Sequence, residues 1–310
     1  MWSVKYNASF LNPQGYIFHF YPSLKAALDK DEDPNCYDIL LLGGSVLKSF
    51  EFEDELKNGF AGNLKKKIRI YNLAMPAYTS LDSYYEYKNL LNKKFSLVIY
   101  YDGINDLFLN NCPLSVFKED YSHFSWYNEI NQFERLGRVN FISLPFTFYC
   151  IRAKIREKLN PLEYILSGTN MPRQGWVRYG SDIKTKNSYR ENIFKILEIA
   201  EKKKEPVVLM TFASYVPENY SLENFNKRLL DYGSYYCPIE IWGSPENIKK
   251  GILTNNQTIE DLIQYYTNIT FIDQDKLVPK NGNYFDDPCH FSQKGYQEFT
   301  SNILDALYKK

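Results

Sequence analysis

Residues 37–45, YDILLLGGS, join a short apolar run to two glycines and a serine. An apolar run of this length without polar alternation is typical of a strand that is buried on both faces. The glycines predict that the strand stops at Gly43 and Gly44. We therefore expect residues 37–42 to form the first strand of an α/β sheet.

The chain around this strand repeats an alternation of strand and helix. The other predicted strands are residues 68–73, 96–101, 206–212 and 269–273, and the predicted helices lie near 52–66 and 80–93, from about 185, over most of 213–267 and at the C-terminus. Alternation of this kind predicts parallel pairing with right-handed crossovers. The predicted fold class is a flavodoxin-like three-layer α/β/α arrangement around a five-stranded parallel sheet.

Residues 107–184 break the alternation and are rich in Tyr, Phe and Trp. Structureless loops of this length are uncommon in compact domains, so we expect a lid or cap with helical pieces near 146–166. The chain has no internal repeat and no Pro/Gly/Ser linker. We therefore predict a single domain over residues 1–310 that carries this aromatic-rich insertion.

Composition excludes several classes of function. The 37 basic residues balance the 37 acidic residues, which leaves no strong field to attract nucleic acid. No span reaches the roughly 18 apolar residues that cross a bilayer, and the N-terminus lacks a secretory signal pattern. The five cysteines are scattered without a C-x-x-C pair, so we expect reduced thiols, no metal and no cofactor, in a cytoplasmic protein.

Ser45 follows the two glycines at the predicted carboxyl end of the first strand, where α/β folds hold their ligands. In this place a serine could act as a nucleophile, or it could cap the helix that follows, as serine often does. Lys48 and Ser49 also suggest a phosphate loop, but the G-x-x-x-x-G-K-[ST] spacing is absent.

Two more loops are expected at the same edge of the sheet. Residues 102–106, DGIND, follow the third strand, and in the strand order 2-1-3-4-5 Asn105 faces the same crevice as Ser45. Its amide could donate a hydrogen bond to an oxygen that gains charge, or the segment could be a plain turn. Residues 72–80, NLAMPAYTS, follow the second strand and could supply a backbone N–H, with Thr79 or Ser80 capping the next helix.

Residues 285–291, FDDPCHF, lie between the last strand and the C-terminal helix and hold one of only three histidines. Asp287 could accept from one imidazole nitrogen of His290 while the other nitrogen takes a proton from Ser45. The alternative is a histidine at a helix start that Asp287 satisfies. Its coincidence with Ser45 and Asn105 at one sheet edge favours the catalytic interpretation.

These motif blocks resemble the SGNH/GDSL hydrolase superfamily over about residues 37–106 and 185–305. The resemblance implies four roles: nucleophile and backbone oxyanion donor Ser45, side-chain oxyanion donor Asn105, orienting acid Asp287 and general base His290. Two usual glycines of the second block align with Ala74 and Ala77. Ala77 keeps the backbone N–H that would complete the oxyanion hole, although a positive φ there would cost roughly 1 kcal/mol.

Members of this superfamily hydrolyse carboxylic esters and thioesters of lipids and sugars, and some transfer acyl groups. The resemblance therefore implies a serine esterase that acts through an acyl-enzyme without a metal ion, on a small-molecule or saccharide ester such as an O-acetylated sugar. One alternative is an O-acyltransferase with the same triad. Another is a catalytically idle saccharide-binding module, an interpretation that the alanines at positions 74 and 77 motivate.

Overall fold

The computed structural model describes residues 17–18, 20–31, 33–136, 151, 155 and 175–309. The chain divides into two compact units, Met1–Lys30 with Leu114–Asn170 and Asp31–Pro113 with Met171–Lys310. The sheet and every candidate site residue belong to the second unit. A single domain with a lid at 107–184 stays a prediction, and the helical pieces near 146–166 fall almost entirely outside the described residues.

Five parallel strands form one sheet in the order β2-β1-β3-β4-β5. Their bounds are β1 Cys36–Gly43, β2 Lys67–Asn72, β3 Leu97–Tyr101, β4 Val207–Met210 and β5 Ile269–Ile272. The three central strands are almost wholly buried, as their unbroken apolar runs predict. The predicted parallel sheet and its strand order are therefore confirmed.

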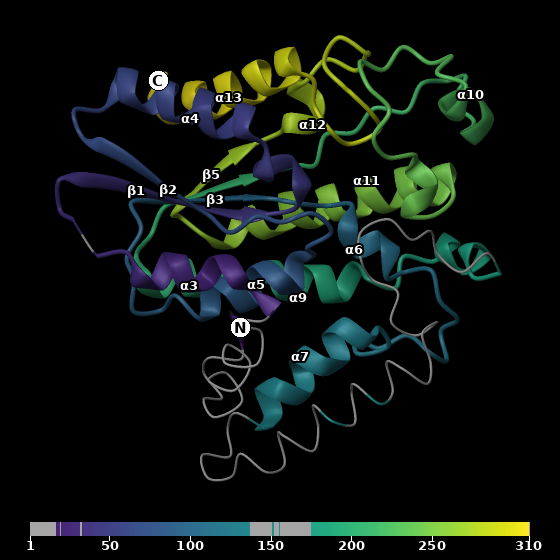
Figure 1. The fold of residues 1–310 in the computed structure, drawn as a ribbon, viewed down its shortest axis with the longest axis horizontal. Coiled ribbons are helices and arrows are strands. Elements are labelled where there is room, and N and C mark those ends of the chain that lie inside the picture. Colours follow the sequence, from purple (N-terminus) through teal and green to yellow (C-terminus); the bar gives the residue numbers. More distant parts are fainter. Residues whose placement is uncertain are drawn as a thin grey trace. The chain divides into compact units, whose positions relative to one another are not determined.

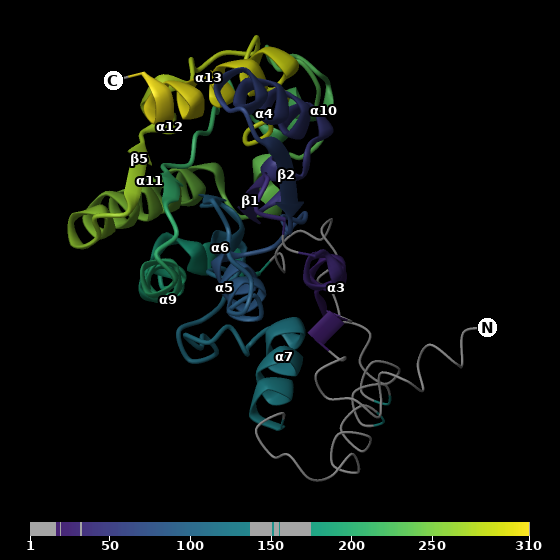
Figure 2. The same cartoon turned by 90° about the vertical axis from the view of Figure 1, so that its left-hand side faces the viewer.

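Helices cover both faces of the sheet (Figure 1), which confirms the three layers. On one face α4 (Phe50–Asn63) packs beside α13 (Gln293–Tyr308). On the other face α9 (Lys186–Lys203) packs against both α5 (Ser80–Lys88) and α11 (Pro245–Leu262), as the second view also shows (Figure 2). The other helices among the described residues of this unit are short: η1 Ser45–Lys48, α6 Asn105–Phe108, η2 Val177–Ser181, α10 Leu222–Asn226, η3 Ile239–Ile241, η4 Ile263–Tyr265 and α12 Gln274–Leu277.

The contact between α4 and α13 follows from helical periodicity. The side chains of Phe52, Leu56 and Phe60 recur every four residues on α4 and are completely buried. Phe52 meets Phe299 of α13 edge to face, with 5.5 Å between the ring centroids. Burying one such aromatic side chain contributes about 1.5–3 kcal/mol, so this aromatic contact helps to hold α13 against α4.

The prediction of a mostly helical stretch over residues 213–267 is wrong for its first half. Between β4 and α11 the chain forms only the short helices α10 and η3. Gly233, Pro238 and Gly243 interrupt this stretch, and Gly243 has a φ of 148° that a helix does not accept. The apolar spacing in this stretch instead belongs to a long loop that packs into the core.

The first unit contains α3 (Pro22–Asp29) and α7 (Ser125–Leu136). Its aromatic residues contact one another: the ring of Phe20 meets Trp126 at 5.1 Å, and that of Tyr121 meets Tyr127 at 5.5 Å. Within the described ranges, no helix combines the length and the apolar character that crossing a bilayer requires.

Gly43 occupies the last position of β1, where it pairs with Tyr101 of β3. Its φ is 152°, and a Cβ at this position would lie 2.1 Å from the carbonyl oxygen of Tyr101. Only glycine therefore lets β1 stay paired to its end and then turn into the segment that carries Ser45.

We expect Gly43→Ala to lower the free energy of unfolding by about 2 kcal/mol or more, because it adds both backbone strain and a steric clash. Gly62→Ala is the matched control. Gly62 lies in α4, and a Cβ added to it would meet no neighbouring atom within 4 Å. The control should raise the free energy of unfolding by up to ~1 kcal/mol through helix propensity. Urea titration of the parent protein and the two variants checks both expected changes in stability. Equal midpoints for Gly43→Ala and Gly62→Ala would contradict the strain expected at position 43.

Candidate active site

Ser45, His290 and Asp287 form a continuous chain of hydrogen bonds. The Oγ of Ser45 lies 2.7 Å from Nε2 of His290, and Nδ1 of His290 lies 2.7 Å from Oδ2 of Asp287. The tautomer with its proton on Nδ1 satisfies both contacts, because Nε2 is then free to accept from the serine hydroxyl. Ser45 does not cap the helix η1, whose N-cap is Gly44 without any side-chain hydrogen bond.

Asp287 is completely buried and is held by backbone donors from two segments. Its Oδ1 accepts from the N–H groups of Cys289 at 2.9 Å and His290 at 2.8 Å. Its Oδ2 accepts from the N–H of Cys237 at 3.1 Å as well as from the imidazole. Each carboxylate oxygen therefore accepts two hydrogen bonds, so the carboxylate has little freedom to rotate away from the histidine.

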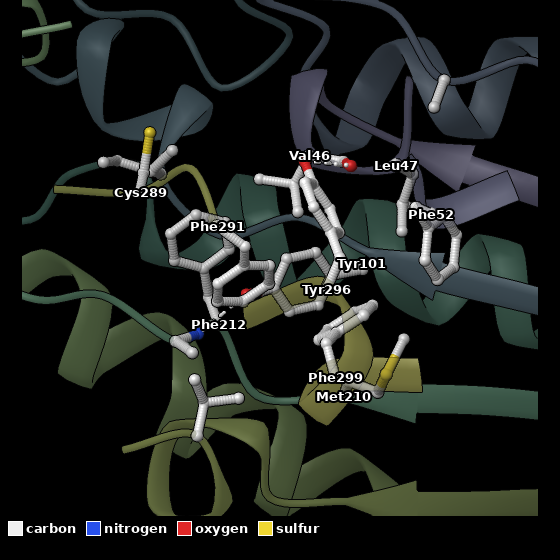
Figure 3. Close-up of a cluster of buried hydrophobic side chains, with 14 of the residues drawn as sticks. Val46, Leu47, Phe52, Tyr101, Met210, Phe212, Cys289, Phe291, Tyr296 and Phe299 are labelled. Carbon is white, nitrogen blue, oxygen red and sulfur yellow. Dashed lines mark hydrogen bonds between the residues drawn. The ribbon is translucent and has the colours of Figure 1, made fainter. Parts of the chain in front are cut away.

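A buried aromatic cluster supports the segment that carries the histidine (Figure 3). Phe285 and Phe291 pair across this segment as an isolated antiparallel bridge. The ring of Phe291 contacts Tyr296 at 5.6 Å and Phe299 at 5.1 Å. The Tyr296 hydroxyl in turn donates to the carbonyl oxygen of Val46 at 3.0 Å, so one cluster fixes both the base and the residue that follows the serine.

The amide of Asn105 is oriented by a residue far along the chain. Trp242 donates from its indole Nε1 to Oδ1 of Asn105 at 3.0 Å, and since an indole nitrogen can only donate, this bond identifies the amide oxygen. The amide nitrogen Nδ2 donates to the carbonyl oxygen of Tyr78 at 2.8 Å. A Cβ on Gly44 would lie 2.7 Å from Nδ2, so the amide nitrogen approaches the backbone beside Ser45 at a place that only glycine leaves open.

In the described part of the chain, three hydrogen-bond donors in the segments that follow β1, β2 and β3 have no acceptor. They are the backbone N–H groups of Ser45 and Ala77 and the second N–H of the Asn105 side chain. Ala77 has a φ of 65°, in the left-handed region, at a cost of roughly 1 kcal/mol for alanine. Its loop is held by hydrogen bonds from Met75 N–H to the Gly43 carbonyl at 3.3 Å and from Tyr78 N–H to the Met75 carbonyl at 3.2 Å.

Asp106 joins two of the loops that supply these donors. Its carboxylate accepts from the backbone N–H of Ser80 at 3.0 Å and from the Ser80 hydroxyl at 2.6 Å. Of the two predicted caps, Thr79 and Ser80, Thr79 caps α5 through a capping box with Asp82. The sequence alone assigns no role to Asp106 or Trp242. The DGIND block places Asp106 beside Asn105, whereas no local pattern marks Trp242.

The charge around His290 affects how readily it accepts a proton. Burial alone lowers the pKa of this imidazole, but the hydrogen bond to Asp287 and the negative charges of Asp287 and Asp286 outweigh burial. The pKa of His290 is therefore raised above its ordinary value of 6.5. A raised pKa makes His290 a stronger base toward the Ser45 hydroxyl, and its neutral form becomes available as the pH rises through that pKa.

No protein-family model matches the chain, and no curated protein sequence matches it either. It is similar to a GDSL-like lipase from Bacteroides thetaiotaomicron, at 15% identity over 97% of this chain and 98% of the other, with a TM-score of 0.49. It is also similar to a lipase/acylhydrolase from Enterococcus faecalis, at 17% identity over 87% and 94%, with a TM-score of 0.41. A catalytic mutant of an acetylxylan esterase from Geobacillus stearothermophilus gives 11% identity over 88% and 95%, with a TM-score of 0.46.

All three structures are at most 17% identical to this chain, and their TM-scores are at most 0.49. The function proposed below therefore rests on the geometry of this chain's own residues.

Asp287→Asn should lower the pKa of His290 relative to the parent protein, because it removes the negative charge that offsets burial. The pKa can be measured by NMR titration of the imidazole resonances, with His290→Gln identifying the signal among the three histidines. The parent protein should titrate above 6.5, the ordinary value for histidine. An unchanged titration in Asp287→Asn would show that the carboxylate does not control the imidazole.

Proposed function

We propose that this chain hydrolyses a carboxylic ester through an acyl-enzyme formed on Ser45. The observation that carries the proposal is the hydrogen-bond chain from Asp287 through His290 to the Ser45 hydroxyl, with 2.7 Å at each imidazole nitrogen. Both distances fall within the range that proton transfer to a general base requires. The unoccupied donors beside Ser45 supply the second requirement, a place for the negative oxygen.

In the first half-reaction, Oγ of Ser45 attacks the ester carbonyl carbon while Nε2 of His290 takes the hydroxyl proton. The carbonyl oxygen becomes negatively charged and accepts from the N–H groups of Ser45 and Ala77 and from Nδ2 of Asn105. Asp287 holds the imidazole in its working tautomer and stabilises the imidazolium. The tetrahedral intermediate then collapses, and His290 gives its proton to the departing alcohol oxygen.

In the second half-reaction, a water molecule gives its proton to Nε2 and its oxygen attacks the acyl carbon. The same donors stabilise the second oxyanion, and the acid leaves as Ser45 recovers its proton from His290. An acceptor hydroxyl in place of water would give acyl transfer by the same steps. Product partition between free acid and a new ester, measured with a sugar present, therefore distinguishes an acyltransferase from a hydrolase.

An exposed aromatic ring beside the base favours a saccharide as the alcohol part of the substrate. The side chain of Tyr236 is 68% exposed, and its ring centroid lies 6.4 Å from that of His290 at an interplanar angle of 89°. The leaving oxygen must come close to Nε2 of the same imidazole, and a sugar attached to that oxygen is large enough to reach this ring. Tyrosine rings offer an apolar face with a wet edge, which suits an O-acetylated sugar.

Replacing Ser45 tests the proposed function directly. The parent protein should react with a fluorophosphonate probe and hydrolyse p-nitrophenyl acetate, while Ser45→Ala should do neither above background. Intact-mass spectrometry should place one probe adduct on the parent protein. Equal labelling of the two proteins would reject Ser45 as the nucleophile.

The oxyanion donor can be tested through Trp242, which positions Asn105. Trp242→Phe keeps a buried aromatic ring but removes the N–H that fixes the amide, so we expect kcat to fall by about 10-fold with little change in KM. Asn105→Ala should cost more, about 100-fold, since it removes the donor itself. Adding Trp242→Phe to Asn105→Ala should cost little further activity, whereas full additivity would contradict a role through Asn105.

A further inference from the structure

Cys237 lies beside Asp287, in the long loop between β4 and α11. Its backbone N–H donates to Oδ2 of Asp287, and its thiol is half-buried beside that carboxylate. The Sγ of Cys237, a carboxylate oxygen of Asp287 and an imidazole nitrogen of His290 all lie within 4.8 Å of one another. In the part of the chain that the structure describes, no other three such side chains are gathered this closely.

We propose that Cys237, Asp287 and His290 form a binding site for a thiophilic divalent cation, Zn²⁺ or Cd²⁺, and that an ion bound there blocks the triad. The blocking part rests on the proposed function, whereas the binding part does not. Sulfur, nitrogen and oxygen ligands together match the set that Zn²⁺ takes from proteins. Mg²⁺ prefers oxygen ligands and would gain nothing from the thiol.

The three ligand atoms need to move only slightly to surround an ion. In a tetrahedral zinc site, ligand atoms about 2.0–2.3 Å from the metal lie roughly 3.3–3.8 Å from one another. Nδ1 of His290 and Oδ2 of Asp287 are 2.7 Å apart, so they would separate by about half an ångström while the sulfur moves in. The His290 side chain is 17% exposed, which gives an ion a route in from solvent.

Binding would disable the base by changing where its proton sits. The thiol of Cys237 must lose its proton to solvent to bind the cation. If Nδ1 of His290 binds the ion, the proton that it carried moves to Nε2, which then donates to Ser45 and cannot accept from it. The positive ion also neutralises Asp287, so the imidazole loses the negative charge that stabilises its protonated form.

The binding test uses Ser45→Ala, so that it does not depend on turnover. Calorimetry with Zn²⁺, and the thiolate charge-transfer absorbance with Cd²⁺, should show one site in this protein and no response to Mg²⁺. Adding Cys237→Ser should weaken Cd²⁺ binding by about 100-fold, because it removes a metal ligand. Removing only a group that orients a ligand already weakens metal binding by about 10- to 100-fold. Cys36→Ser is the matched control and should leave binding unchanged, because Cys36 begins β1 at the opposite end of the strand from Ser45.

Equal Cd²⁺ affinity with and without Cys237 would overturn the site. In the parent protein, saturating Zn²⁺ should suppress fluorophosphonate labelling of Ser45, and a chelator should restore it. Full labelling of the zinc-bound protein would overturn the block while leaving the site in place. A protein that binds Zn²⁺ but never reacts with the probe, even without metal, would instead reject the proposed function and with it the block.

Discussion

The buried carboxylate of Asp287 is the constraint on which the site depends. A carboxylate without exposure to water is costly unless hydrogen bonds replace its hydration. Three backbone N–H groups, from Cys237, Cys289 and His290, provide that replacement together with the imidazole. Two segments separated by about fifty residues of chain must therefore come together before the base can be oriented, which couples folding of the loops to assembly of the site.

Two residues with positive φ lie where the chain leaves the sheet on the side of Ser45. Gly43 has a φ of 152° at the end of β1, and Ala77 has a φ of 65° in the loop after β2. Gly43 lies two residues before Ser45, and Ala77 is itself one of the proposed oxyanion donors. Backbone strain that clusters at a site of chemistry is held by the structure around it, here by the pairing of Gly43 with Tyr101 and the hydrogen bond from Met75 to Gly43.

Much of this arrangement could be predicted because its determinants are local. The apolar runs and the glycines define the strands, and a parallel sheet with order 2-1-3-4-5 brings the residues after β1 and β3 to one edge. Spacing within FDDPCHF predicts the Asp287–His290 pair. The long loop after β4 was missed because its apolar residues resemble a helix until glycine and proline interrupt them. Trp242 could not be found, since its partner Asn105 lies 137 residues away and no pattern connects them.

Two buried carboxyl groups near Ser45, those of Asp287 and Asp102, differ in the hydrogen bonds that they accept. Asp287 accepts four hydrogen bonds, as a charged carboxylate should. Asp102 lies beside Gly44 and accepts at Oδ1 from the N–H of Gly103, while its Oδ2 has no partner among the described residues. Burial, reinforced by the charge of Asp106, raises the pKa of Asp102 well above its ordinary value. Because burial disfavours the charged form of Asp102, this carboxyl group opposes an oxyanion beside it less than an exposed carboxylate would.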